Sequence, residues 1–65
     1  MMYSITQLKE GRCRCRMVIQ DDIKIWETDN LQQAVQSMIR NAEALNHAKI
    51  TLRDIRILQE NQPGS

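Results

Sequence analysis

The chain has 65 residues, of which 42% are hydrophobic and 26% are charged, and this composition is typical of one small globular domain rather than a disordered segment. Nine Lys and Arg against eight Asp and Glu give a formal net charge of +1, far below that of proteins that coat nucleic acid. No apolar run approaches the ~20 residues of a membrane span, and residues 1–11 lack the apolar core of a secretion signal. We expect one domain over residues 1–59, a disordered tail over residues 60–65 and no membrane partner.

The first part of the chain predicts a β-hairpin. Residues 3–8 are a candidate for a short leading strand, with residues 9–11 as its turn and Gly11 in the left-handed region. Residues 12–19 alternate at first between Arg and apolar side chains, as a half-buried strand does. Gln20, Asp21 and Asp22 supply turn chemistry, and residues 23–27 alternate again. The two runs predict a hairpin over residues 12–27, with Ile23 and Ile25 on the core face.

The next segment predicts an amphipathic helix over residues 30–46, because its apolar residues recur at intervals of three and four. Asp29 is the expected N-cap, with Gln32 as its capping-box partner. Asn46 and His47 are plausible stop signals. The apolar stripe consists of Leu31, Ala34, Val35, Met38, Ile39, Ala42 and Leu45.

Residues 49–58 allow two interpretations. Three isoleucines within eight residues suit the pleated surface of a strand, and a bulge near Arg53 and Asp54 would turn all the apolar residues to the core. The helical alternative rests on Thr51 and Asp54, which are spaced as in a capping box. We predict a strand over residues 50–57.

Together these elements predict the α+β class: a small antiparallel sheet with one helix packed on one face. The hairpin and the final strand form the sheet, and the leading strand is an optional addition. Because a single helix leaves one sheet face uncovered, a homodimer through that face or through an edge strand is an alternative outcome. The expected core, which contains no Phe, is Cys13, Cys15, Met17, Ile19, Ile23, Ile25, Leu31, Val35, Met38, Ile39, Ala42, Leu45, Ile50, Leu52, Ile55 and Ile57.

The sequence carries no motif of an enzyme or a cofactor site. A disulfide between Cys13 and Cys15 would close a very small, strained ring, and these thiols with the single His47 are too few for a structural zinc site. Two glycines leave no phosphate-binding loop. We therefore predict a non-enzymatic, cytoplasmic protein with two reduced, buried thiols, no metal and no cofactor.

Strand parity predicts one suggestive surface, a basic face on the uncovered side of the sheet, centred on Trp26. Such a face is compatible with three readings. It could be an ordinary solvated face, a docking site for the acidic surface of a larger protein, since Arg and Trp are enriched at interface hot spots, or a nucleic-acid site in which Trp26 stacks on a base. We rank protein above nucleic acid, because one aromatic offers little stacking and the net charge is small. The predicted binding residues are Arg12, Arg14, Arg16, Lys24, Trp26 and Arg56, with Arg53 as a further candidate.

The order of strand, turn, strand, acidic cap, helix and final strand over residues 12–58 resembles small accessory proteins of bacteriophages, a group that includes a short inhibitor of bacterial RNA polymerase. The segment 26–31 (Trp-Glu-Thr-Asp-Asn-Leu), the helix and residues 50–57 carry this resemblance of layout. No functional residue is carried over, because this chain is richer in Arg than the more acidic binding surface of that inhibitor. The resemblance implies a phage- or bacterium-encoded regulator that docks on a larger protein.

Overall fold

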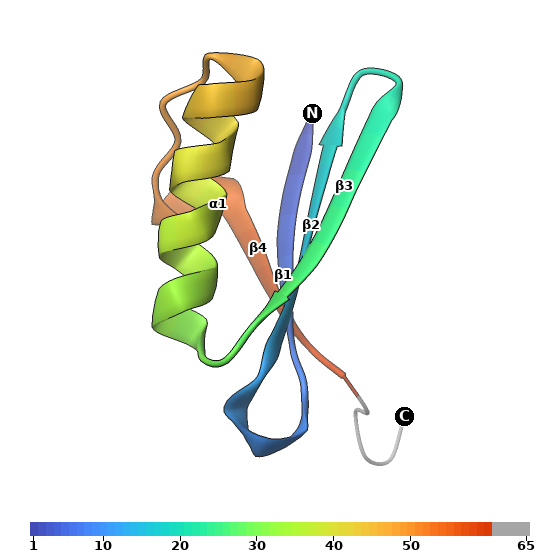
Figure 1. The fold of residues 1–65 in the computed structure, drawn as a ribbon, viewed down its shortest axis with the longest axis vertical. Helices are drawn as coiled ribbons and strands as arrows, with labels where there is room; N and C mark the ends of the chain where they lie inside the picture. Colours follow the sequence, from blue (N-terminus) through green and yellow to red (C-terminus); the bar gives the residue numbers. More distant parts are fainter. Residues whose placement is uncertain (61–65) are drawn as a thin grey trace.

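A computed structural model describes residues 1–60 as a four-stranded sheet with one helix on one side (Figure 1), which confirms the α+β class. Residues 61–65, which make up most of the predicted tail, lie outside the described residues. The described part of the chain contains no helix long and apolar enough to cross a membrane. In chain order the elements are β1 (Met2–Gln7), the 3-10 turn η1 (Lys9–Gly11), β2 (Cys13–Ile19), β3 (Asp22–Thr28), α1 (Leu31–Asn46), the 3-10 turn η2 (Leu52–Asp54) and β4 (Ile55–Gln59).

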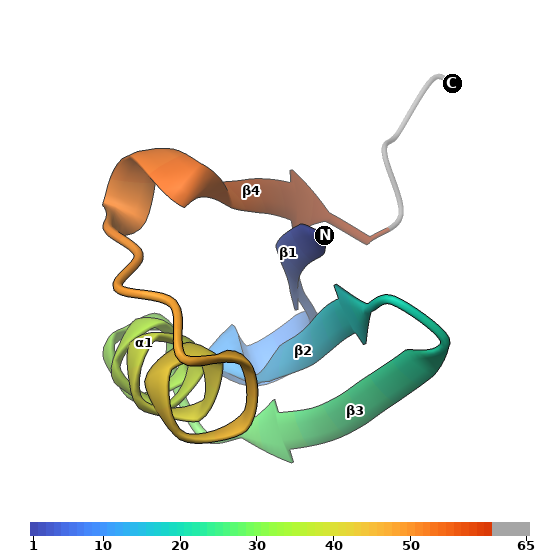
Figure 2. The same cartoon turned by 90° about the horizontal axis from the view of Figure 1, so that it is seen from above.

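The sheet has the strand order β3-β2-β1-β4, so the leading strand β1 lies inside the sheet instead of being an optional addition. The β1–β2 and β2–β3 pairs are antiparallel, as predicted, but β4 runs parallel to β1. The sheet is therefore mixed, and the prediction of a purely antiparallel sheet was wrong. The reason is the crossover: α1 carries the chain back along the sheet, so β4 runs in the same direction as β3 and β1 (Figures 1 and 2).

The turn before β2 follows the sequence prediction. Gly11 has a φ of 78° and Glu10 a φ of 61°, so the chain turns through the left-handed region that glycine adopts without steric cost. The backbone N–H of Leu8 donates to the carbonyl of Arg12 at 2.7 Å and closes the turn. This turn places β1 and β2 side by side.

The N-cap of the helix lies one residue later than predicted. Asn30, not Asp29, is the N-cap: its side chain accepts a hydrogen bond from the backbone N–H of Gln33 at 2.8 Å. The side chain of Gln33 in turn accepts from the backbone N–H of Asp29 at 3.3 Å. Asn30 is the cap because its side-chain oxygen, and not that of Asp29, accepts the backbone N–H of Gln33. At the other end His47 has a φ of 52° and ends the helix, as predicted.

Residues 51–59 combine the two interpretations that the sequence left open. Asp54 accepts a hydrogen bond from the backbone N–H of Thr51 at 2.8 Å, and Thr51 accepts one from the N–H of Arg53 at 3.3 Å. This capping box supports η2, a single 3-10 turn, where the strand interpretation placed a bulge. The strand begins only at Ile55, because the capped turn occupies the residues before it.

The core lies between the sheet and α1. It confirms the predicted burial of Cys13, Cys15, Met17, Met38, Ala42, Ile50 and Ile55, and it adds Tyr3, Ile5 and Ala34. Ile19, Leu31 and Val35 pack against it while staying partly exposed. Six predicted core residues are exposed instead: Ile23, Ile25, Ile39, Leu45, Leu52 and Ile57.

Two causes account for these exposed residues. Ile23 and Ile25 lie on the wrong face of the sheet, for a reason given below. The others lie at the margin of α1 or beside it, because α1 packs mainly on β2 and also touches β1 and β3, but not β4 to a comparable extent. A helix of this width covers only part of a four-stranded sheet, so the β4 side of the helix stays open.

Met38 is fully buried at the centre of the helix stripe. Met38→Ala should lower the free energy of unfolding by about 2–5 kcal/mol, because it leaves a cavity that the small core cannot close. Leu45→Ala is the matched control on the same helix: its side chain is 50% exposed, and its loss should cost less than about 1 kcal/mol. Urea denaturation followed by circular dichroism measures both, and equal costs would contradict this assignment of the helix face.

Candidate functional site

The loop between β2 and β3 determines which side chains face away from the helix. Ile19 pairs with Asp22, so only Gln20 and Asp21 form the loop, and Gln20 takes a left-handed conformation with a φ of 48°. The sequence prediction counted Asp22 as a third loop residue. A change of one residue in a hairpin moves every side chain of the second strand to the other face.

This register overturns the predicted placement of Trp26 and Lys24. Trp26 pairs with Cys15 and Lys24 with Met17, so both lie on the helix side of the sheet and not beside the arginines. Ile23 and Ile25, predicted to be in the core, pair with Val18 and Arg16. Their side chains lie on the uncovered face, where they are 51% and 62% exposed.

Trp26 connects the sheet to the helix. Its ring Nε1–H donates to the hydroxyl of Ser37 at 2.9 Å, and that hydroxyl donates to the carbonyl of Ala34 at 2.9 Å. The side chain of Ser37 also reaches the thiol of Cys15. A half-buried Trp held in this way is part of the sheet–helix interface and is not available to stack on a ligand.

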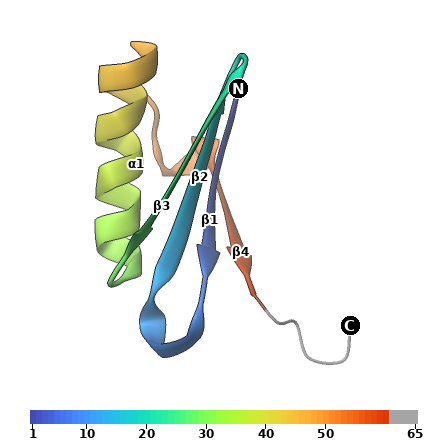
Figure 3. The same ribbon diagram turned by 45° about the vertical axis from the view of Figure 1, so that its right-hand side comes forward.

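The uncovered side of the sheet, which we call the open face, combines arginines with aliphatic side chains. Figure 3 shows the sheet and α1 as two layers, with the open face on the side away from the helix. The strand registers place alternate residues of all four strands on it. These residues are Met2, Ser4, Thr6, Arg14, Arg16, Val18, Ile23, Ile25, Glu27, Arg56 and Leu58.

The middle of the open face carries positive charge that no acidic side chain in the described part of the chain neutralises. Ser4 pairs with Arg16 on one side and with Arg56 on the other, and it is only 7% exposed although no helix covers it. This burial is consistent with the two flanking arginines, since arginine stems pack along a sheet while their charged ends stay in water. Among residues 1–60, neither Arg16 nor Arg56 forms an ion pair.

The β3 edge of the open face is different, because its charges are partly neutralised. Glu27 pairs across the strands with Arg14, at 3.8 Å between Oε2 and Nε, and it also forms an ion pair with Arg12. Arg12 precedes β2 and reaches this edge through that contact. Arg53 lies in η2, outside the strands, so the predicted residues that the structure brings together in the sheet face are Arg14, Arg16 and Arg56.

The chemically reactive groups do not gather into a site. Cys13 and Cys15 are unpaired and buried, as predicted. Burial raises the pKa of both thiols, the interaction with the Ser37 side chain lowers that of Cys15 in part, and the neighbouring Cys13 raises it further. Over the described residues, no three His, Cys, Asp or Glu side chains come close enough to hold a metal ion.

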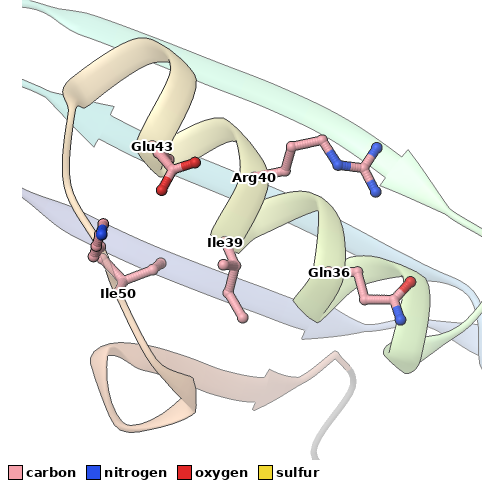
Figure 4. A pocket seen from close by; sticks show the side chains of 6 residues that line it. Gln36, Ile39, Arg40, Glu43 and Ile50 are labelled. Atoms are coloured by element: carbon pink, nitrogen blue, oxygen red, sulfur yellow. The ribbon is translucent and has the colours of Figure 1, made fainter.

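A groove runs along α1 on the side that faces η2 and β4. Its more apolar part is lined by Leu31, Val35, Leu52 and Ile57, together with Gln32 and Gln36. A second hollow on the same side of the helix, which shares Gln36 with the first, is lined by Ile39, Arg40, Glu43, Lys49 and Ile50. In Figure 4, Ile39 on the helix and Ile50 on the following loop point toward the same space. The groove therefore follows from the limited width of the helix layer.

Comparisons with protein-family models, with curated proteins and with solved structures found no match to this chain. Over residues 12–58 the observed order of β2, β3, α1 and β4 agrees with the layout on which the phage resemblance rests, while β1 precedes it, and no family match supports that kinship. The candidate site is therefore argued from its own residues. Sequence reasoning missed its aliphatic members, Ile23 and Ile25, and the two-residue loop is the signal that would have found them.

We expect Trp26→Phe to lower the free energy of unfolding by about 1–2 kcal/mol, because the ring stays apolar but the hydrogen bond to Ser37 is lost. Ser37→Ala removes the same bond from the other side, so the double variant should cost less than the sum of the two single variants. Urea denaturation followed by circular dichroism measures the three values. Strict additivity would show that Trp26 does not bind the helix as described.

The buried thiols predict a loss of stability at alkaline pH. Because the pKa of both is higher in the folded than in the unfolded chain, their contribution is complete below the ordinary thiol pKa of about 8.5 and is lost as pH rises through the folded-state values. The variant carrying Cys13→Ala and Cys15→Ala should show a flatter decline. Denaturation by urea at a series of pH values tests this, and identical slopes would contradict it.

Proposed function

We propose that this chain is a non-enzymatic binding protein that docks through its open face on a larger protein. The matching partner surface is acidic at its centre and aliphatic around it. One observation carries the proposal: Arg16 and Arg56 form no ion pair with any residue from 1 to 60, and they lie on the same uncovered sheet face as the exposed Ile23 and Ile25.

The mixture of side chains favours a protein partner. Exposed aliphatic side chains gathered on one face mark interaction surfaces, and Arg is enriched at the centre of protein interfaces. Arginine also forms paired hydrogen bonds with carboxylates, which gives a docked complex a fixed orientation. An acidic helix or sheet with aliphatic neighbours would satisfy both parts of the face.

The same observations weigh against the two alternatives for this face. A nucleic-acid site of the predicted kind needs Trp26 beside the arginines, and Trp26 is on the helix side instead. A homodimer that stacks two open faces would bring Arg14, Arg16 and Arg56 of both copies together, with Glu27 as the one acidic side chain that the strand registers place among them, which is unfavourable.

An enzymatic role has no support in the described residues. The two thiols are buried with raised pKa values, so they are poor nucleophiles. His47 is exposed at the end of α1. A regulator or inhibitor of a larger bacterial or phage machine is one form that docking would take, and that form rests on the resemblance of layout.

The proposal is tested by selecting random peptides, displayed on particles, for binding to the folded protein. Enriched sequences should combine Asp or Glu with aliphatic residues, and the best synthetic peptide should shift the backbone NMR signals of β2 and β3 residues on the open face. Arg16→Glu should weaken its binding at least about tenfold by reversing a central charge. Lys24→Glu, with the same change in net charge on the other side of the sheet, should not.

Three results would count against this function: enriched peptides without acidic residues, signals that shift only along the α1 groove, or equal losses in the two variants. A single-stranded RNA or DNA probe is titrated in parallel. Binding of that probe that is lost in Arg16→Glu, with a logarithm of affinity that falls linearly with the logarithm of salt concentration, would favour nucleic acid instead.

A further inference from the structure

The two edges of the sheet are protected to different degrees. β3 carries Asp22, Lys24 and Glu27 among its seven residues, and charged side chains of this kind discourage pairing with another strand. β4 has the sequence Ile-Arg-Ile-Leu-Gln, with Arg56 as its single charged residue and no proline. A strand of this composition at a sheet edge is a template for a further strand.

The backbone of β4 has an outward-facing donor and acceptor at its centre. The N–H of Glu60 donates to the carbonyl of Gln7 in β1 at 3.0 Å. Because the backbone groups of successive strand residues point to opposite sides, Arg56 and Leu58 also direct theirs to β1. Ile57, between them, directs its N–H and C=O away from β1, toward the free edge.

We propose that the free edge of β4 pairs with β4 of a second copy of this chain. The two strands run antiparallel about a two-fold axis through Ile57, and the two sheets join into one continuous sheet. The two Ile57 residues exchange two backbone hydrogen bonds at the axis. In this register all five residues of β4, residues 55–59, lie opposite β4 residues of the other copy.

Side-chain charges favour this register over its neighbour. Arg56 of one copy lies opposite Leu58 of the other, and Glu60 of the other copy is the next residue on the same face, within reach of a long side chain. A shift that centred the pair on Arg56 would place the two arginines directly opposite each other. Asp54 does not oppose Glu60, because it lies in η2 and its carboxylate accepts the N–H of Thr51.

The same pairing removes apolar surface from water. The side chain of Ile57 is 39% exposed and lines the groove beside Leu31, Val35 and Leu52. In the dimer Ile57 of the second copy lies directly beside it on the same face of the sheet. The contact is isologous, so β4 of each copy supplies one side of it and no other partner is needed.

Proline at position 57 separates pairing from folding. Ile57→Pro removes an N–H that points to the free edge, while every backbone hydrogen bond from β4 to β1 is retained. Ile57→Val is the matched control: it is similar in size to proline and keeps the N–H. Sedimentation equilibrium over a wide range of concentration should give twice the monomer mass for the wild-type chain and Ile57→Val, and the monomer mass for Ile57→Pro.

Exchanging the charges of Arg56 and Glu60 is a second test of the register. It remains informative if Ile57→Pro does not fold. Arg56→Glu and Glu60→Arg should each weaken the dimer several-fold, and the two together should restore it, because the Arg–Glu contact between copies is re-formed with reversed partners. Hydrogen exchange adds a direct readout: the Ile57 amide should exchange more slowly as protein concentration rises.

The proposal is overturned by a wild-type chain that stays monomeric at high concentration. A folded Ile57→Pro variant that still dimerises would place the contact on another surface. If the variant with both charge changes dimerises no more tightly than the variants with one change, the register is contradicted. None of these readouts depends on a bound partner at the open face, so they leave the proposed function to its own test.

Discussion

The two-residue loop at Gln20 and Asp21 is the constraint on which the working surfaces of this protein depend. It pairs Ile19 with Asp22 and thereby determines the face of every side chain in β3. In this register Trp26 reaches Ser37 on the helix, while Ile23 and Ile25 join the arginines outside. With one more loop residue, the same sequence would present an aromatic basic face. The chemistry of the open face is thus decided by turn geometry rather than by composition.

Local patterns were sufficient for some of the fold and insufficient for the rest. The α1 periodicity, the left-handed Gly11 and the capping box at Thr51 and Asp54 each depend on a few neighbouring residues, and each could be read from the sequence. Strand order cannot be read in this way, because the pairing of β1 with β4 joins segments about 50 residues apart. The predicted facing of the side chains was correct for β2 and wrong for β3. Alternation could not separate the two cases, because it shows that a strand has two faces but not which face meets the helix.

Several aliphatic side chains are exposed because a single helix is too narrow to cover a four-stranded sheet. One helix covers the sheet mainly at β2, so most of the buried sheet residues lie on the middle strands β1 and β2, and the core contains no Phe. A domain of this size buries only a small apolar area on folding and gains from every apolar side chain that it can bury, yet Ile25, Ile57 and Leu58 remain exposed. Isoleucine and leucine at such positions do little for the folded monomer. Their presence on the open face and along β4 is explained more simply by surfaces that are covered when the protein associates.

The two surfaces that we propose are compatible and reinforce each other. A two-fold axis at Ile57 stands perpendicular to the sheet, so both helices lie on one side of the joined sheet and both open faces on the other. Arg56 lies next to the axis in each copy, and Arg16 lies two strands further out across β1. The dimer would therefore present a single broad surface with two equal halves, in which Arg56 contacts Glu60 of the other copy and Arg16 of each half remains available to an acidic partner. A partner that carries two acidic sites, or is itself two-fold symmetric, would engage both halves, and the second contact would form at a high effective concentration. A weak docking site of one small domain would in this way gain affinity without any additional contact within either half.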